Sequence, residues 1–287
     1  MSKHKFRFGV QTASIASDEA SREKARKIED LGYSTLMIPD HFREQFAPLP
    51  AMMAAAAATT TLRVGGLVLD NDYKHPVVLA KELATLDVLS GGRLELGIGA
   101  GWMESDYREA GMPYDPPGVR ISRLQEGVQV IKGLFADEKL EFDGKFYNVH
   151  MNGSPKPEQK PHPPILIGGG GKRLLKFAAR EADIVGVKFV LTEGVVNEAV
   201  MATGTPEATR EKIGWIREAA GARFDELELN ITIFAAIVTN DGASLAERLA
   251  PRFASTPAEL PRAPHVLLGS VDEIVDELQR RREEFGF

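Results

Sequence analysis

The sequence predicts a (β/α)8 TIM barrel, an α/β fold, formed by a single domain over residues 1–287. Two observations lead to it: β-rich runs alternate with amphipathic helical segments, and seven or eight such units fit into the chain. Strands separated by helices pair in parallel, because each crossover returns the chain in the same direction. So many units close into a barrel better than they extend into an open sheet, which leaves a doubly wound sheet as the second choice.

Four βα units fill the first half of the chain. Each pairs a β-rich run with a helical one: residues 6–12 with 18–31, 34–39 with 48–60, 62–69 with 75–89, and 93–99 with 120–135. The second half repeats the pattern less cleanly, with 164–169 before 172–182, 182–187 before 205–221, 226–238 before 242–251, and 265–269 before 270–285. We therefore expect a parallel sheet with the helices as crossovers.

Two irregularities interrupt this alternation. Residues 140–163 are predicted to form an insertion between units four and five, with a hairpin that turns at Asp143-Gly144 and a proline-rich segment after it. Such an insertion is typical of a lid or an interface loop. The chain stops at Phe287, where we expect a last barrel strand to begin, so this strand is predicted to be missing from the sequence.

Composition excludes several classes of partner and chemistry. With 41 acidic and 35 basic residues the net charge is -6, which predicts no nucleic-acid partner. The absence of cysteine excludes disulfides and thiolate nucleophiles and is compatible with a reducing cytoplasm. The N-terminus shows no apolar signal region, and the apolar run at 51–58 is too short for a bilayer, so we expect a cytoplasmic protein without a membrane partner.

Candidate chemistry lies where the predicted strands end, because functional side chains of such barrels sit there. Asp40 and His41 follow the second strand, and a carboxylate beside an imidazole can move a proton near neutral pH. Local capping and packing explain the pair equally well. Trp102, after the glycines that end strand four, can stack on a flat ligand or pack under the insertion.

Glycines mark the ends of three strands. Gly65 and Gly66 interrupt strand three, which indicates a bulge, a close ligand or close helix packing. Gly168–Gly171 precede a helix, and their N–H groups suit a phosphate or the polar edge of a flavin ring. Lys188, just past strand six, adds a cation, although a solvated surface lysine is the alternative. The six histidines show no metal-ligand spacing, and no nucleophile elbow or Walker loop is present, so cofactor chemistry is favoured.

Three long segments carry a family resemblance: PDHF from residue 39, the stretch from Gly65 to Trp102, and the stretch from Pro161 to Asp183. Together they resemble the luciferase-like monooxygenase superfamily, and most closely its branch that uses the deazaflavin coenzyme F420. The resemblance implies that Asp40 and His41 lie over the cofactor ring, with His41 assisting hydride transfer. It also implies that a non-proline cis peptide at Gly66-Leu67 backs the ring.

Further site residues follow from the same resemblance. Gly101 and Trp102 would contact the cofactor, Gly168, Gly169 and Gly170 would bind the pyrimidine edge or the ribityl-phosphate arm, and Lys188 the phosphate. Family dehydrogenases that act on sugar phosphates have a glutamate where Trp102 stands, which argues against a sugar phosphate substrate. Glu104 or Asp106 are candidates to replace that acid. Trp102, Met103 and the insertion are expected to shape the substrate pocket.

The sequence thus predicts an F420-dependent oxidoreductase that transfers hydride between the deazaflavin and a small organic substrate, with no metal. One alternative is an FMN-dependent monooxygenase of the same family, and another is a flavin- or deazaflavin-binding protein without turnover. The resemblance also implies a homodimer. The apolar helices at 51–60 and 75–89 could form its interface, although packing against the barrel explains them as well.

Overall fold

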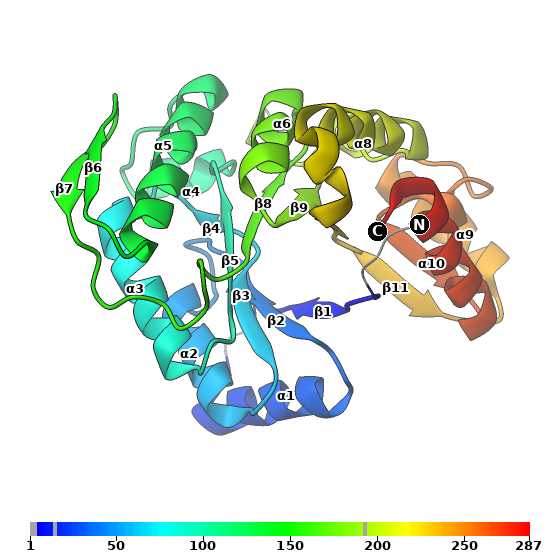
Figure 1. Ribbon diagram of the computed structural model, residues 1–287. Coiled ribbons are helices and arrows are strands. Elements are labelled where there is room, and N and C mark those ends of the chain that lie inside the picture. The colour runs from blue at the N-terminus through cyan, green and yellow to red at the C-terminus, as the bar shows by residue number, and fades with distance from the viewer. Residues whose placement is uncertain (1–4, 14–15, 192–193) are drawn as a thin grey trace. The chain divides into compact units, whose positions relative to one another are not determined.

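A computed structural model describes residues 5–13, 16–191 and 194–287 (Figure 1). The chain divides into two compact units, one formed by Arg7–Ile167 and the other by Met1–Phe6 with Gly168–Phe287. We refer to them as the N-terminal unit and the C-terminal unit and describe each by itself. That the chain forms a single domain stays a prediction.

The N-terminal unit contains a parallel sheet with its helices as crossovers. Its elements are β1 (Gly9–Gln11), α1 (Asp18–Asp30), β2 (Thr35–Ile38), α2 (Pro48–Ala58), β3 (Arg63–Gly66), β4 (Leu69–Asp70), α3 (Pro76–Leu89), β5 (Leu94–Gly99), α4 (Glu104–Glu109), α5 (Pro117–Phe135), β6 (Leu140–Asp143), β7 (Asn148–Met151) and β8 (Ile165–Gly169), which continues into the C-terminal unit. The strands pair in parallel in the order β1-β2-β3-β5-β8, and β4 also pairs with β5.

This strand order separates the two predicted folds. In the N-terminal unit the order β1-β2-β3-β5-β8 follows the order along the chain without a reversal, whereas a doubly wound sheet reverses its order at a switch point. The α/β class and the parallel crossovers are therefore confirmed, and the order is that of a barrel. Closure of the barrel, and the strand expected beyond Phe287, stay predictions.

The central strands of this unit are buried on both faces. β2 and β5 are buried at every position, as expected for strands covered on each side. α2 packs on β2 and β3, and α3 on β5. At the amino ends of the strands, buried Glu95 accepts hydrogen bonds from Arg7 at 2.6 Å and Arg63 at 2.7 Å, so its charge is paired.

Residues 140–151 form the predicted hairpin. β6 and β7 pair antiparallel, from Leu140 with Met151 to Asp143 with Asn148. The carboxylate of Glu126 on α5 accepts hydrogen bonds from the N–H groups of Lys145, Phe146 and Tyr147, at 2.9, 2.8 and 3.2 Å. The turn is thereby tied to α5. Whether this segment is an insertion into a barrel stays a prediction.

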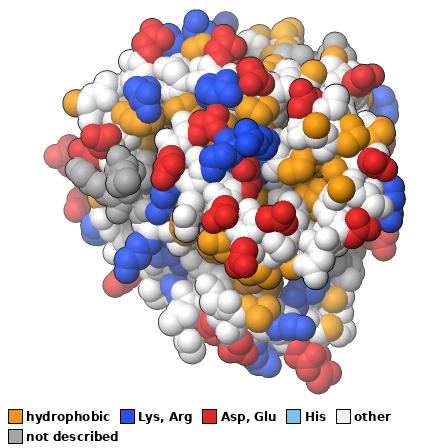
Figure 2. All heavy atoms as spheres, turned by 90° about the vertical axis from the view of Figure 1, so that its right-hand side faces the viewer, with side chains coloured by type: hydrophobic (Ala, Val, Ile, Leu, Met, Phe, Trp, Pro, Cys, Tyr) orange, Lys and Arg blue, Asp and Glu red, His pale blue; other side chains and the backbone are white. Residues whose placement is uncertain are grey.

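The C-terminal unit repeats the alternation of strands and helices. It contains α6 (Lys172–Glu181), β9 (Ile184–Val187), α7 (Glu198–Ala202), α8 (Pro206–Ala220), η1 (Gly221–Glu226), β10 (Glu228–Ile231), β11 (Ala235–Val238), α9 (Gly242–Leu249), η2 (Ala250–Phe253), η3 (Leu260–Arg262), β12 (Val266–Gly269) and α10 (Val271–Phe285). β9 pairs with β10 and β11 with β12, both in parallel. On the face in Figure 2, acidic and basic side chains are interspersed.

One predicted strand is wrong in its extent. The sequence predicts a single strand over 226–238, but the structure has β10 and β11 in separate pairings. The break follows from the tertiary partners: Glu228–Ile231 match β9, while Ala235–Val238 match β12, which begins beside buried His265. A run of β-forming residues does not reveal where its partner changes.

Candidate active site

Polar side chains gather where the strands of the N-terminal unit end. Asp40 and His41 follow β2, Asp70 ends β4, and Trp102 and Asp106 follow β5. Because the carboxyl ends of neighbouring parallel strands lie at the same edge of a sheet, these residues share one end of the unit. Hydrogen bonds and ring contacts between them, described next, confirm that they are brought together.

His41 has an open ring nitrogen at this end of the N-terminal unit. Its Nδ1 lies 2.7 Å from Oδ2 of Asp106, and because a carboxylate only accepts, Nδ1 carries the hydrogen. Its ring meets Trp102 edge-on, with centroids 5.8 Å apart and planes at 89°. The imidazole side chain is 21% exposed, and Nε2 has no partner among the residues that the structure describes. Nε2 can therefore accept a proton, or donate one when the ring is protonated.

Asp106 is the residue that orients this imidazole. It lies in the first turn of α4 and is buried, and Tyr73 donates its hydroxyl to the same Oδ2 at 3.2 Å. Tyr73 in turn packs against Phe42 with ring centroids 4.4 Å apart. A carboxylate held in this way fixes both the tautomer and the ring orientation of its histidine. Sequence reasoning weighed Asp106 only as a substitute acid and missed this contact.

Asp40 has a different partner from His41. Its Oδ2 accepts the backbone N–H of Asp70 at 3.1 Å, which ties the end of β2 to the end of β4. Burial raises the pKa of Asp40, although the Asp70 N–H and the neighbouring His41 and Lys74 oppose the rise. The predicted pair is thus adjacent in the chain, but His41 is oriented by Asp106 and Asp40 anchors the backbone.

A buried acidic cluster lies next to these residues. The Tyr107 hydroxyl is 3.2 and 3.0 Å from the two carboxylate oxygens of Asp70 and 3.1 Å from Oδ2 of Asp72. A hydroxyl has one hydrogen to donate to these acceptors. The Arg123 guanidinium lies 2.9 Å from the Asp72 carboxylate and balances its charge. Burial raises the pKa of Asp70 to about 7, and the negative charge of Asp72 adds to the rise. The cluster therefore holds a proton on Asp70 up to neutral pH.

The glycines of this unit are explained by close packing. A Cβ on Gly97 would lie 1.9 Å from the carbonyl oxygen of Gly66, so β3 and β5 approach closely only because both lack side chains. Gly101 has φ +70°, and a Cβ there would lie 1.9 Å from the Tyr107 hydroxyl. That Gly66 and Gly101 contact a cofactor stays a prediction.

Leu67 lies at a cis peptide bond, but not the predicted one. The cis bond joins Leu67 to Val68, one residue later than the predicted Gly66-Leu67, so that position was wrong by one. The carbonyl oxygen of Leu67 accepts a hydrogen bond from Gln11 Nε2 at 2.8 Å. The contact links the segment after β3 to the end of β1.

The remaining predicted residues lie together in the C-terminal unit. The N–H of Lys188 donates to the carbonyl of Gly169 at 2.9 Å, and a Cβ on Gly170 would lie 2.1 Å from the carbonyl oxygen of Phe189. Gly168 is buried, while Gly171 faces open space as the N-cap of α6, which has no side-chain cap. Burial lowers the pKa of Lys188 to about 8. The backbone at Lys188 and the segment that leads into α6 thus lie next to each other.

Comparison with known proteins identifies the family. A sequence model of the luciferase-like monooxygenase family matches residues 4–286. The chain belongs to this luciferase-like family. The family resemblance inferred from the sequence is confirmed, and membership supports an oxidoreductase or monooxygenase activity.

Curated relatives of this luciferase-like protein use two kinds of cofactor. It is 31% identical over 218 residues to an F420-dependent glucose-6-phosphate dehydrogenase of Kineococcus radiotolerans, covering 73% of the chain and 61% of the relative. It is 34% identical over 131 residues to an FMNH2-dependent dimethylsulfone monooxygenase of Pseudomonas putida, covering 45% of the chain and 36% of the relative. The matches thus span less than two thirds of either relative.

Solved structures share the fold of the luciferase-like protein. The coenzyme F420-dependent tetrahydromethanopterin reductase of Methanopyrus kandleri superposes with a TM-score of 0.77 at 18% identity, covering 98% of this chain and 91% of that one. The monooxygenase RslO1 of Streptomyces bottropensis gives 0.75 at 23%, covering 98% and 90%. At these identities the likeness shows the fold alone.

The described residues contain neither a metal-binding cluster nor a membrane-spanning helix. Among residues 5–13, 16–191 and 194–287, no group of three or more histidine, aspartate or glutamate side chains could hold a metal ion. No helix in that part of the luciferase-like chain is long and apolar enough to cross a membrane.

Proposed function

We propose that this luciferase-like protein is an F420-dependent oxidoreductase that transfers hydride between the deazaflavin and a small organic substrate. The observation that carries the proposal is the His41 imidazole, with Nδ1 fixed by buried Asp106 at 2.7 Å and Nε2 open. Hydride transfer to or from a carbon–oxygen bond needs a matching proton transfer at oxygen. An oriented imidazole with one free nitrogen supplies it.

The residues present fit a flavin-type cofactor. In the N-terminal unit, His41, Trp102 and Asp40 line the carboxyl end of the sheet, where cofactors bind in α/β folds. In the C-terminal unit, α6 begins without a side-chain cap, so the positive end of its dipole suits a phosphate, and Lys188 adds positive charge. When bound, the deazaflavin would supply or accept the hydride.

His41 would move the proton of the reacting oxygen. In oxidation of an alcohol, Nε2 accepts the hydroxyl proton and the imidazolium formed is stabilised by Asp106. In reduction of a carbonyl, the same nitrogen donates the proton. Tyr73 keeps Asp106 in place in both directions, with its hydroxyl 3.2 Å from Oδ2.

Trp102 would select the substrate class. Its ring stands edge-on to His41, so the group that meets Nε2 also meets an apolar aromatic wall. An apolar wall favours a small organic carbonyl or alcohol over a sugar phosphate, in agreement with the absence of the glutamate expected for sugar phosphates. The Pseudomonas relative, 34% identical, supports an FMN-dependent monooxygenase as the second candidate.

A parallel titration of the full chain with coenzyme F420 and with FMN, followed by fluorescence, tests the proposal. Tight binding of F420 with FMN at least about tenfold weaker, a difference of about 1.4 kcal/mol, would support it. The reverse preference, with oxygen consumption on reduction, would replace it with the monooxygenase. Binding of neither compound would overturn the cofactor assignment. The His41→Gln variant should bind the preferred cofactor normally while losing turnover.

A further inference from the structure

Three consecutive carbonyl groups follow β5, in a stretch that belongs to neither a helix nor a strand. They are those of Ala100, Gly101 and Trp102. A carbonyl that is shielded from water costs free energy unless a donor satisfies it. The Arg120 guanidinium donates to the first two, through Nε to Ala100 at 3.2 Å and through Nη2 to Gly101 at 3.4 Å. The Tyr114 hydroxyl donates to the third, at 2.8 Å.

Arg120 is a buried cation whose contacts are carbonyl groups and an aromatic ring. It lies in the first turn of α5 and is 2% exposed. A further nitrogen, Nη1, donates to the Asp115 carbonyl, and the guanidinium carbon lies 4.1 Å from the centroid of the Tyr114 ring. A buried charge is costly unless such contacts compensate it. Because the guanidinium is planar, these contacts together require one arrangement of the stretch after β5.

The last residue of this stretch forms one wall of the candidate active site. The Trp102 ring stands edge-on to His41, with centroids 5.8 Å apart. Gly101 turns the chain just before it with φ +70°, and the Tyr107 hydroxyl occupies the place where a Cβ would lie. Side chains of α4 and α5 therefore enclose the backbone that leads into the indole, and its carbonyl is bonded directly.

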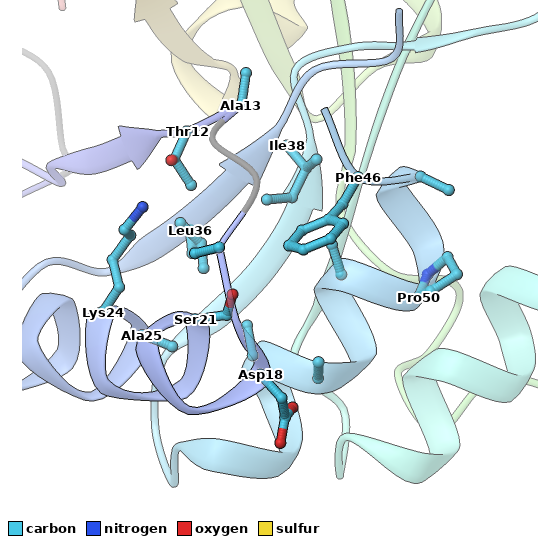
Figure 3. A pocket seen from close by; sticks show the side chains of 15 residues that line it. Thr12, Ala13, Asp18, Ser21, Lys24, Ala25, Leu36, Ile38, Phe46 and Pro50 are labelled. Atoms are coloured by element: carbon cyan, nitrogen blue, oxygen red, sulfur yellow. The ribbon is translucent and has the colours of Figure 1, made fainter. Parts of the chain in front are cut away.

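The loop that carries His41 has anchors of its own. Its imidazole is bonded to a buried carboxylate of α4. Gln45 Nε2 donates to the Pro39 carbonyl at 2.6 Å, which ties the loop back to the end of β2. Phe46, where the loop ends, lines an apolar pocket with side chains of β2 and α2 (Figure 3). None of these contacts uses the donors that hold Trp102, so loosening the indole should leave the imidazole in place.

We propose that Arg120 and Tyr114 are positioning residues, which fix the Trp102 ring at one edge of the candidate active site and thereby set the size of substrate that it admits. An aromatic wall held in one place selects substituents of one size, whereas a loosened wall adapts to larger ones. The role in substrate choice rests on the proposed function. The positioning of Trp102 does not.

Trp102 fluorescence in a Trp215→Phe background tests the positioning without cofactor or substrate, because the chain has two tryptophans. Tyr114→Phe removes one hydrogen bond and keeps the ring, while Arg120→Lys keeps the charge and removes the planar fork. Each should raise the acrylamide quenching constant of Trp102 by at least about twofold. If Arg120→Lys does not fold, as judged by circular dichroism, Tyr114→Phe decides the result.

Matched controls sit at exposed positions of the same unit. Tyr33→Phe removes a hydroxyl from a side chain that is 37% exposed, and Arg108→Lys changes an arginine of α4 that is 68% exposed. Neither should alter the quenching constant. A quenching constant that is unchanged in Tyr114→Phe, or raised equally in Tyr33→Phe, would overturn the proposal.

Oxidation of propan-2-ol and of octan-2-ol by coenzyme F420 tests the consequence for substrate choice. Tyr114→Phe should raise KM for propan-2-ol about fivefold and leave kcat within about twofold, because His41 keeps its own anchors. KM for octan-2-ol should rise less, so the preference for the smaller alcohol falls. An unchanged preference would overturn the role in substrate choice. If the unmodified protein oxidises neither alcohol, the proposed function and this role both fail, and the positioning of Trp102 is decided by fluorescence alone.

Discussion

The hydrogen bonding of buried polar groups differs between the two units of this luciferase-like protein. Around His41 in the N-terminal unit they are joined to one another, as His41 to Asp106, Tyr73 to Asp106 and Tyr107 to Asp70. In the described part of the C-terminal unit, four buried side-chain atoms lack a hydrogen-bond partner: Thr209 Oγ1, Asn230 Oδ1, Thr232 Oγ1 and His265 Nε2. In the described part of the N-terminal unit, one buried side-chain atom, Asp72 Oδ1, lacks a hydrogen-bond partner.

This difference separates a preorganised site from an incomplete one. A partnered network fixes its members before any ligand arrives, which suits a group that moves protons. Buried atoms without partners cost free energy until water or a ligand satisfies them. We therefore expect the N-terminal unit to set the rate of the reaction and the C-terminal unit to contribute mainly to binding. The following predictions test this division, from the largest effect to the smallest.

The largest effect is expected at His41. His41→Gln should lower kcat by about 10³-fold, because it removes the general acid and base. Asp106→Asn should lower kcat less, and it should also change the pH profile, since the amide no longer stabilises an imidazolium. Steady-state kinetics over pH measure both. His150→Gln, on the exposed β7 strand, is the control, and equal loss in this variant would contradict a role specific to His41.

Asp70 should make the N-terminal unit less stable as pH rises. Burial raises its pKa from 3.8 to about 7, so between these values the folded chain binds more protons than the unfolded chain. The free energy of unfolding then falls as pH rises through this window, by at most about 4 kcal/mol. Asp70→Asn should remove this fall. Urea unfolding at about pH 5 and about pH 8 measures this fall. If the free energy of unfolding changes equally with pH in the unmodified protein and in Asp70→Asn, the assignment of the fall to Asp70 is refuted.

His265 should give the C-terminal unit the opposite slope. Burial lowers its pKa from 6.5 to about 4, although its hydrogen bond to the Thr232 carbonyl opposes this. Between these values the unfolded chain binds more protons, so the free energy of unfolding rises with pH, by at most about 3 kcal/mol. His265→Asn should remove the rise, as measured by the same urea unfolding. If Asp70→Asn and His265→Asn change the pH dependence of the free energy of unfolding in the same direction, the proposed difference between the two units is wrong.

Gly97 tests the close packing of the N-terminal unit. Gly97→Ala should lower the free energy of unfolding by about 2 kcal/mol, because its Cβ would lie 1.9 Å from the carbonyl oxygen of Gly66. Gly214→Ala in α8 is the matched control, since a Cβ there meets nothing within 4 Å. This control should raise stability by about 0.5–1 kcal/mol through helix propensity. Thermal and urea unfolding compare the two.

The smallest effect is expected at Lys188. Lys188→Met should weaken binding of the phosphate-bearing cofactor by about tenfold and leave binding of its phosphate-free analogue unchanged. Because the pKa of Lys188 is about 8, the affinity of the unmodified protein should also fall above that pH. Fluorescence titration measures both. Lys176→Met, at a half-buried lysine paired with Glu218, is the control.

Local patterns predicted the elements but not their long-range partners. The alternation of strands and helices, the hairpin at 140–151 and the positions of Asp40 and His41 could be inferred from neighbouring residues. Asp106 was not predicted as the partner of His41, because the two residues are 65 positions apart and give no local signal of the contact. The division of 226–238 into β10 and β11 was missed for the same reason.

The glycines show a second limit of prediction from sequence. A glycine pattern indicates a missing side chain without saying what occupies the space. Gly66 was compatible with a ligand or with packing, and the close approach of its carbonyl oxygen to Gly97 on β5 favours packing. The expected homodimer and the cytoplasmic location stay predictions, because they concern partners and surroundings outside a single chain.

The hydrogen bonds from the β6–β7 turn to Glu126 bear on how the expected lid would work. A carboxylate that accepts three successive backbone N–H groups ties the hairpin turn to α5. We therefore expect the hairpin to move with α5 and not to open and close on its own during turnover. If it borders the substrate, related proteins with other substrates should differ in the side chains it carries and in its length, while the time taken for product to leave should depend on other parts of the chain.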